Sequence, residues 1–234
     1  MQENPDLDSF KEGQVLLFDK PLGWTSFQVV NKVRWLIKKT YGIKKIKVGH
    51  AGTLDPLATG LLLLCTGKFT KRIEEFMGQE KEYTGTITLG ATTPSYDLET
   101  EIDSTFSLDG ITEEAVHAAT SSFTGTINQR PPVFSALKKE GKRLYEFARA
   151  GESVEIPERE VHIEAFEITG INLPDVHFRV VCSKGTYIRS LAHDFGKALN
   201  NGAHLSALRR TKIGDFQVKN ALKIEDFETN LLNN

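Results

Sequence analysis

The residue best suited to chemistry in this sequence of 234 residues is Asp55, a carboxylate in a loop bounded by glycine and proline. Gly52, Pro56 and Gly60 exclude a long regular element here, so special backbone conformations must shape the loop. A carboxylate held in such a loop can attack as a nucleophile or help to remove a proton. Because Asp before proline is also a common turn residue, position alone leaves a purely structural role open.

A second candidate site lies in the segment CSKGTYIR, residues 182–189. The segment reads as the end of a strand followed by a glycine turn, and it carries Tyr187 and Arg189 two positions apart. In extended backbone, residues two apart point to the same face, so the two side chains are expected to enter one pocket. The alternative is a surface arginine beside a core tyrosine.

The common catalytic motifs are missing from the sequence. It contains no phosphate-binding P-loop, no dinucleotide fingerprint, no nucleophile-elbow serine motif and no zinc-binding His-Glu-x-x-His. Cys65 and Cys182 lie far apart, without the spacing of a redox or zinc site, so we expect buried free thiols, no disulfide and no metal. Nucleotide hydrolysis, nicotinamide redox chemistry and zinc hydrolysis are therefore disfavoured.

The charges are unevenly distributed although the net charge is only −2. Residues 20–50 contain no Asp or Glu but carry a series of basic residues: Lys20, Lys32, Arg34, Lys38, Lys39, Lys44, Lys45 and Lys47. Smaller basic groups occur at 138–143 and 209–212, whereas residues 97–114 are acidic without any Lys or Arg. A single charge run usually marks a solvated face, but three basic segments favour a polyanion-binding face opposite an acidic back.

Hydrophobic periodicity predicts alternating short strands and helices. Strands are expected at 13–19, 61–66, 81–89, 161–171 and 176–183, and helices from Thr25 or Ser26 to about Ile37 and at 68–77, 112–122, 142–150 and 190–199. The acidic stretch is expected to be a surface loop, and the prolines predict an extended excursion at 129–138. Without a regular strand-helix-strand period, this order indicates an α+β fold with a mixed sheet.

Six segments in order resemble the bacterial tRNA pseudouridine synthases of the TruB family. They are DKPLGWTS (19–26), GHAGTLDPLATG (49–60), KEY (81–83), RPPVFSALK (130–138), KGTYIR (184–189) and LSALRRT (205–211). The resemblance runs from about Val15 to Phe216, and the dodecapeptide around Asp55 is highly specific. It implies a pseudouridine-synthase-like mixed, largely antiparallel sheet flanked by helices and loops, with a thumb-like RNA-binding loop.

The resemblance also implies roles for individual residues. Asp55 stands where the family has its essential aspartate, and Tyr83 where a tyrosine stacks on the target base. Arg189 matches an arginine that pairs with the aspartate, and Tyr187 lies beside it. Leu208 corresponds to an apolar residue that lines the pocket.

Two further residues carry implied roles at the same site. His50 matches a histidine that contacts RNA near the flipped nucleotide, and Lys20 matches a lysine that supports the site from the first motif. The implied reaction is isomerisation of the T-loop uridine, at position 55 of tRNA, to pseudouridine. Since this rearrangement gains no group and changes no oxidation state, neither a metal nor another cofactor is expected.

The resemblance sets the expected domain boundaries. Residues 1–12 are expected to be an N-terminal tail, 13–216 the catalytic domain with its thumb-like loop at about 124–152, and 217–234 a short C-terminal remnant. Bacterial members usually carry a further C-terminal RNA-binding domain, and the residues after Phe216 are too few for one. RNA affinity is then expected to rest on the basic helix, the thumb-like loop and Arg209 with Arg210.

The expected partner is tRNA, bound through its T stem-loop by a cytoplasmic monomer. The longest apolar runs are too short to cross a membrane, and the N-terminus lacks the pattern of a secretory signal. Three other functions remain open: a non-catalytic RNA-binding protein such as a tRNA-folding chaperone, a pseudouridine synthase acting on another RNA, and a sugar-phosphate or glycosidic enzyme. The last is disfavoured because the second carboxylate usual in glycoside hydrolysis has no evident motif.

Overall fold

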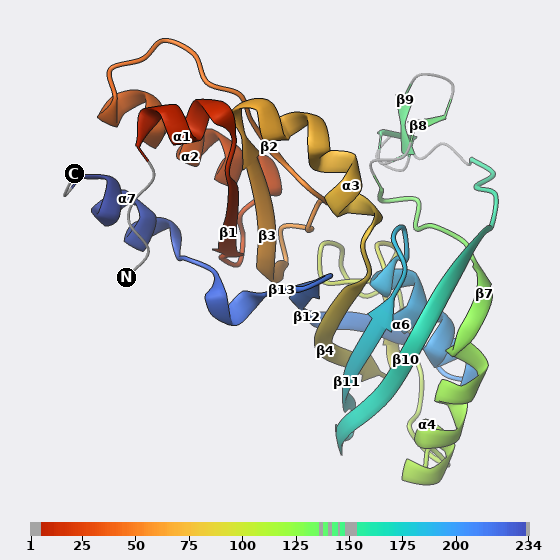
Figure 1. Ribbon diagram of the computed structural model, residues 1–234. Coiled ribbons are helices and arrows are strands. Elements are labelled where there is room, and N and C mark those ends of the chain that lie inside the picture. The colour runs from red at the N-terminus through yellow and green to blue at the C-terminus, as the bar shows by residue number, and fades with distance from the viewer. Residues whose placement is uncertain (1–5, 136–137, 140–141, 145, 148–153, 233–234) are drawn as a thin grey trace. The chain divides into compact units, whose positions relative to one another are not determined.

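The computed structural model describes residues 6–135, 138–139, 142–144, 146–147 and 154–232 (Figure 1). The chain folds as two compact units, Met1–Tyr83 with Arg209–Asn234, and Thr84–Leu208. They are called the first and the second unit below. Two strands, β4 (Lys81–Leu89) and β12 (Ala203–Ile213), contribute residues to both units.

The first unit is an α+β arrangement built on β3. Its elements are α1 (Leu7–Glu12), β1 (Val15–Lys20), α2 (Ser26–Thr40), β2 (Val48–His50), β3 (Ala58–Thr66), a 3₁₀ turn (Gly67–Arg72), α3 (Ile73–Gly78), β13 (Phe216–Gln217), a second 3₁₀ turn (Val218–Asn220) and α7 (Ile224–Leu232). Strand β3 pairs antiparallel with β1 and with β2. Its other neighbour is β12, which also pairs with β13.

The continuous apolar run of β3 has a physical reason: both of its faces are covered. Because side chains alternate along a strand, Leu62 and Leu64 enter one hydrophobic cluster with α2 and α7, while Leu61 and Leu63 enter another near α3. All four leucine side chains are fully buried. The strand that follows Asp55 is therefore among the best-anchored elements of the first unit.

Helix α2 begins where the sequence predicts, because Thr25 caps it. The Thr25 hydroxyl accepts from the Gln28 backbone N–H at 3.1 Å, and the Gln28 side chain accepts from the Thr25 backbone N–H at 2.7 Å. This reciprocal capping box satisfies two backbone donors that would otherwise lack partners. It fixes the first turn of α2, which lies next to the Asp55 loop.

Both ends of the described chain pack into the first unit. Phe10 of α1 and Phe227 of α7 meet edge to face at 6.4 Å between ring centroids, and Phe18 of β1 meets Phe227 at 5.2 Å. Phe10 and Phe18 are fully buried. Residues 7–12 and 224–232 are thus helical and belong to one core cluster.

The second unit contains part of a sheet that has nine strands among the described residues. Its further elements are β5 (Ala91–Thr92), β6 (Ser104–Thr105), α4 (Glu113–Ala119), a 3₁₀ turn (Thr120–Phe123), β7 (Gly125–Gln129), β8 (Lys138–Lys139), β9 (Lys142–Arg143), β10 (Arg159–Asn172), β11 (Asp175–Cys182) and α6 (Ile188–Ala198). The strand order is β12-β4-β11-β10-β7. In Figure 1, α6 lies across one face of β10 and β11, and the edge-to-face pair of Phe166 and Phe195, 5.4 Å apart, anchors it there.

The predicted α+β class with a mixed, largely antiparallel sheet is confirmed. Strand β4 has its predicted bounds, whereas β3 begins earlier, at Ala58. The helix predicted at 68–77 is a 3₁₀ turn followed by the shorter α3. The helix predicted from residue 142 is wrong at its start, because Lys142 and Arg143 pair with Lys139 and Lys138 as strands; 145 and 148–150 lie outside the described residues.

Candidate active site

The Asp55 loop joins β2 to β3 and is pinned by backbone and hydroxyl contacts. The Ser26 hydroxyl accepts from the backbone N–H of Leu54 at 2.8 Å and donates to the Leu54 carbonyl at 3.1 Å. The Gly23 N–H donates to the Pro56 carbonyl at 2.8 Å, and the Ala58 N–H donates to the Asp55 carbonyl at 3.1 Å. The residues on both sides of Asp55 are therefore held, Leu54 by the first residue of α2 and Pro56 by the turn that precedes this helix.

Lys20, the last residue of β1, lies beneath this loop and is fully buried. Its ammonium donates to the carbonyls of Trp24 at 2.5 Å, Pro21 at 3.0 Å and Pro56 at 3.4 Å. The pKa of Lys20 is lowered to about 8, mainly by burial; the negative charge of Asp55 opposes the shift and the nearby Arg210 charge adds to it. The predicted supporting lysine thus lies within the electrostatic reach of Asp55.

Arg210 holds the other side of the loop, and its position corrects the sequence-based expectation. We expected Arg209 and Arg210 together on an RNA-binding surface, but Arg210 is only 1% exposed. Its guanidinium donates to the carbonyls of Leu61 at 2.8 Å and Gly52 at 3.1 Å, with a longer contact of 3.4 Å to that of Thr53. The planar fork of arginine suits several carbonyls at once, so Arg210 fixes the loop rather than meeting solvent.

The strand alternation held a signal for the burial of Arg210. Leu208 and Arg210 lie two apart in β12, so they share one face, and Leu208 was already expected to face the pocket. Gly60 makes the close approach possible: a Cβ there would lie 2.3 Å from the Arg210 carbonyl oxygen, and the residue has φ of +101°. Residue 60 must therefore be glycine for β3 and β12 to pair at this point.

Arg209, in contrast, remains partly exposed and reaches Asp19. Two of its nitrogens donate to the two carboxylate oxygens at 3.0 and 2.7 Å, a bidentate pair, with a further contact of 3.4 Å to the Thr59 hydroxyl. Asp19 immediately precedes Lys20 in β1. The pair fixes the end of β1, from which Lys20 reaches the loop.

His50 lies at the end of β2 and is half-buried. Burial lowers the pKa of His50, the Arg210 charge lowers it further, and a hydrogen bond with the Gly52 backbone opposes the shift. The imidazole is therefore neutral at pH 7, so it can both donate and accept a hydrogen bond. The structure places Lys20, His50 and Asp55 around one loop, and the roles assigned to them remain predictions.

Tyr83 is the last residue of the first unit and lies in β4, where it is 8% exposed. The adjacent residue Glu82 is tied to β12, because the Thr211 hydroxyl donates to its carboxylate at 2.7 Å and to its carbonyl at 3.2 Å. Tyr83 is thus set in a paired, regular strand. Its ring is positioned by a rigid element rather than by a loop.

In the second unit, Tyr187 precedes α6 in extended backbone. The Gln129 side chain accepts from the Tyr187 N–H at 2.7 Å and donates to its carbonyl at 3.0 Å. The Arg159 guanidinium lies over the Tyr187 ring, 4.6 Å from its centroid, and also donates to the Gly185 carbonyl. The half-buried tyrosine is therefore held at the backbone by Gln129 and at the ring by a cation–π contact.

Arg189 corrects the prediction that it shares an extended face with Tyr187. Helix α6 begins at Ile188, so Arg189 lies in its first turn and is 4% exposed. Its guanidinium donates to the carbonyls of Phe134 at 2.9 Å and Ser95 at 3.3 Å, and its Nε lies 3.6 Å from the Asp97 carboxylate. The helix turns Arg189 into the core of the second unit.

Asp97 corrects the expectation that the whole acidic stretch is a surface loop. Its neighbours Leu98, Glu99 and Glu101 are exposed, but Asp97 is only 5% exposed. The carboxylate accepts from the Glu99 N–H at 3.0 Å as well as facing Arg189. A uniform acidic run gave no sign that one member is buried against an arginine distant in the sequence.

Leu208 is half-buried in β12, and it ends the second unit. Tyr187, Arg189 and Leu208 thus belong to the second unit, whereas Lys20, His50, Asp55 and Tyr83 belong to the first. The joint roles of the two groups remain predictions.

Two family models cover most of the chain. One, described as the TruB family pseudouridylate synthase N-terminal domain, matches residues 38–188. The other, described as the tRNA pseudouridylate synthase B C-terminal domain, matches residues 189–234. The chain belongs to the TruB family of tRNA pseudouridylate synthases. The resemblance drawn from the six sequence segments is therefore confirmed.

Curated relatives support the same family assignment. The chain is 65% identical over 225 residues to a Flavobacterium johnsoniae protein named tRNA pseudouridine synthase B, covering 96% of this chain and 98% of that protein. It is 59% identical over 219 residues to a Phocaeicola vulgatus protein of the same name, covering 94% and 93%. Nearly the whole length of both relatives is thus represented.

Solved structures show the same fold. The chain is similar to a Cbf5-Nop10-Gar1 complex, with a TM-score of 0.72 and 32% identity, and to an H/ACA RNP bound to a substrate RNA containing 2′-deoxyuridine, with a TM-score of 0.68 and 29% identity. Each match covers 97% of this chain but only 56% of the other chain. Among the described residues, no helix is long and apolar enough to span a membrane.

Proposed function

We propose that this TruB family member converts the T-loop uridine at position 55 of tRNA to pseudouridine, with Asp55 as the catalytic residue. The observation that carries the proposal is the loop of Asp55, held from two sides by the buried cations Lys20 and Arg210. Both cations donate to backbone carbonyls, which do not neutralise their charge, so the loop lies in a positive local potential that suits a reacting carboxylate.

The reaction requires a carboxylate positioned at the reacting nucleotide and rotation of the uracil ring. The C1′–N1 bond breaks, the uracil ring rotates, C1′ bonds to C5, and the proton on C5 is lost while N1 gains one. Atoms and charge balance without an added group. Asp55 acts on the reacting nucleotide either by covalent attack or by assisting removal of the proton.

The target uridine must leave its stack to reach Asp55. We assign Tyr83 to stack on the flipped uracil, with Tyr187 and Leu208 lining the pocket. Stacking on an aromatic ring recovers part of the few kcal/mol lost on unstacking. Neutral His50, beside the same loop, is assigned to hydrogen-bond the RNA next to the flipped nucleotide.

Arg189 completes the proposed site by pairing with Asp55. A buried guanidinium keeps an adjacent carboxylate ionised in a water-poor pocket. Its contacts with Phe134, Ser95 and Asp97 support this proposal because they leave the guanidinium little freedom to move.

The same proposal covers the organisation of the enzyme. Residues 13–216 are assigned to the catalytic domain, residues at about 124–152 to a thumb-like loop that contacts the T stem-loop, and residues 217–234 to a short C-terminal segment. Within the proposed thumb-like loop, residues 136–137, 140–141, 145 and 148–152 lie outside the described residues. The enzyme acts as a monomer in the cytoplasm, with tRNA as its partner. The molar mass from light scattering, with and without tRNA, tests the monomeric state.

Single-turnover conversion of a T stem-loop RNA tests the catalytic assignment. Asp55→Asn should lower the conversion rate by at least about 10³-fold while RNA binding is retained, because the fold is kept and the reactive carboxylate is removed. The matched control is Asp215→Asn, an exposed aspartate at the turn before β13, which should convert normally.

The outcomes separate the functions left open by the sequence. Binding without conversion by the wild type would favour an RNA-folding chaperone. Equal conversion by wild type and Asp55→Asn would refute the assignment of Asp55. Conversion only of another RNA would move the enzyme to a different substrate.

A further inference from the structure

The exposed face of α2 combines aromatic and basic side chains in an unusual way. Phe27 is 61% exposed and Trp35 is 48% exposed, although both are large and apolar. Asn31 lies between them on the same face, since residues four apart are neighbours on a helix. The two rings are about 12 Å apart along the axis, because each residue advances the helix by about 1.5 Å.

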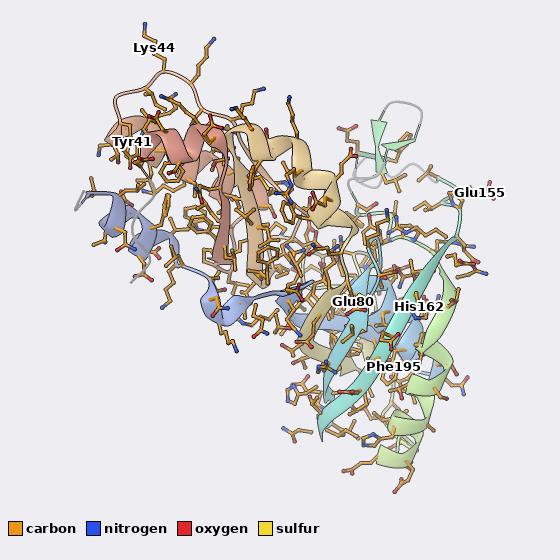
Figure 2. All side chains as sticks on the ribbon, viewed as in Figure 1. Tyr41, Lys44, Glu80, Glu155, His162 and Phe195 are labelled. Carbon is orange, nitrogen blue, oxygen red and sulfur yellow. The ribbon has the colours of Figure 1, made fainter. Side chains whose placement is uncertain are left out.

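Lysines flank this aromatic pair and extend the surface beyond the helix. The ammonium of Lys39 lies 4.8 Å from the Trp35 ring centroid, and that of Lys32 lies 5.1 Å from it. After α2, Lys44 and Lys45 are exposed, while the neighbouring Ile43 and Ile46 pack against the core. Figure 2 shows the Lys44 side chain directed away from the body of the first unit.

We define the α2 surface as Phe27, Asn31, Lys32, Trp35, Lys38, Lys39, Lys44 and Lys45. Its border on one side is acidic, because Glu228 of α7 pairs with Lys32 at 2.7 Å. Residues 20–50 contribute no Asp or Glu of their own. The remaining lysines, Lys38, Lys39, Lys44 and Lys45, therefore give this surface a positive potential.

The α2 surface begins beside the Asp55 loop. Ser26, which is hydrogen-bonded to the backbone of Leu54 through both donor and acceptor, is adjacent to Phe27 in sequence. Leu22 and Leu57, on the two segments joined by the Gly23 to Pro56 hydrogen bond, are also exposed, at 64% and 38%. Phe27 is thus the part of the α2 surface next to the contacts of the Asp55 loop, and Trp35 and the lysines follow further along the chain.

We propose that the α2 surface binds a stretch of the tRNA outside the T stem-loop, with Trp35 and Phe27 stacking on bases and the lysines contacting phosphates. Alternating aromatic and cationic side chains along one groove or face is the chemistry by which proteins hold a nucleic-acid strand. A membrane would require a broader apolar face than two rings and two leucines. The inference rests on the proposed function for the identity of the RNA.

The test compares a full-length tRNA with an isolated T stem-loop. Equilibrium affinity is measured for both RNAs over a range of salt concentrations, with Asp55→Asn as the parent so that no RNA is converted. The logarithm of the affinity falls linearly with the logarithm of the salt concentration, and the steepness of this fall is the salt slope. Lys39→Ala with Lys44→Ala should lower the salt slope for full-length tRNA by about two, because two phosphate contacts are lost. The slope for the T stem-loop should change by less than one.

The matched control removes the same charge elsewhere. Lys197 and Lys219 are exposed and lie outside the α2 surface. Lys197→Ala with Lys219→Ala should therefore leave the difference in salt slope between full-length tRNA and the T stem-loop unchanged. Trp35→Ala should weaken full-length tRNA binding about tenfold, whereas Trp35→Phe should retain most of the affinity, because a ring face remains for stacking. Thermal unfolding confirms that each variant is folded.

The results separate this inference from the proposed function. If Lys39→Ala with Lys44→Ala weakens both RNAs equally, or matches its control, the α2 surface is not a binding site for the outer part of tRNA. That result leaves conversion by the wild type unaffected. If the wild type converts no uridine but the lysine substitutions still weaken full-length tRNA more than the T stem-loop, the proposed function fails while the α2 surface remains an RNA-binding face.

Discussion

Each of the two units buries an arginine, and they balance its charge differently. In the first unit, Arg210 donates to the backbone carbonyls of Leu61, Gly52 and Thr53. In the second unit, Arg189 also donates to carbonyls, but the Asp97 carboxylate lies 3.6 Å from its Nε. Arg210 therefore keeps a net positive charge beside the Asp55 loop, whereas Arg189 has a carboxylate partner within its own unit that helps to hold its guanidinium in place for the proposed pairing with Asp55.

The difference assigns separate roles to the two arginines. A cation bound only by carbonyls fixes a loop and also raises the local potential, which suits the support of a reacting carboxylate. A cation paired with a buried carboxylate is held in one orientation, and removal of either partner leaves the other charge uncompensated. Substitutions of the two arginines test this contrast, and the pH dependence of stability compares burial in the two units.

The largest effect is expected in the second unit. Arg189→Met should lower the free energy of unfolding by about 3–5 kcal/mol, because it leaves the buried Asp97 without its cation. Adding Asp97→Asn should restore at least about 1 kcal/mol of that loss, since no lone charge remains. Chemical denaturation of both variants and of Asp97→Asn completes the cycle. Additive losses in the double variant would contradict the charge pairing.

In the first unit, Arg210→Met should cost about 3 kcal/mol, because several buried carbonyls lose their donor. No carboxylate partner exists for this arginine among the described residues, so no second substitution of that kind should rescue it. Arg210→Lys should retain the positive charge but lose the planar guanidinium that donates to several carbonyls at once. This variant should convert RNA slowly, with little change in RNA binding. Full activity of Arg210→Lys would show that charge alone suffices.

The smallest effects are expected from pH, in a different window for each unit. In the second unit, the pKa of His193, which stacks on Tyr96 at 3.8 Å, is lowered from 6.5 to about 4; burial is the main cause, the Lys197 charge contributes, and the Asp103 charge opposes the shift. Since the unfolded chain binds this proton first, stability should fall as pH drops from about 6.5 to 4, by at most about 2 kcal/mol. His193→Gln should flatten that part of the stability curve.

In the first unit, the same linkage acts on Lys20 at alkaline pH. Its pKa falls from 10.5 to about 8, so the unfolded chain again binds more protons between these values, and stability contributed by this group should rise with pH across them. Lys20→Met should remove this rise. Urea denaturation at each pH gives the free energy of unfolding as a function of pH. If this pH dependence is the same in His193→Gln and Lys20→Met as in the wild type, the effects assigned to burial are contradicted.

The sequence predicted local structure well wherever a local signal exists. Thr25 and Gln28 form the capping box that starts α2, and the alternating pattern of β4 gave its bounds. Lys20 and His50, singled out from ordered motifs, lie at the Asp55 loop, and their roles there remain predictions. These features depend on residues close together in the chain or on a shared family pattern.

Burial of single charges left no trace in the charge pattern, although strand alternation with Leu208 indicated which face of β12 Arg210 occupies. Arg210 and Asp97 each belong to a run of like charges, yet each is buried by partners far away in the sequence. Arg189 was misjudged for a local reason, because α6 starts immediately after Tyr187 instead of two residues later. A carbonyl or carboxylate that becomes available only after folding leaves no mark on the charge pattern itself.

Gly60 carries a consequence for the genetics of the protein. A side chain at this position would collide with the Arg210 backbone at 2.3 Å, and the collision involves main-chain atoms that no rotamer change can move. In a library containing every codon at position 60, selection for activity should therefore return glycine codons alone. Position 23, where a Cβ meets nothing within 4 Å but φ is +80°, should accept asparagine or aspartate as well.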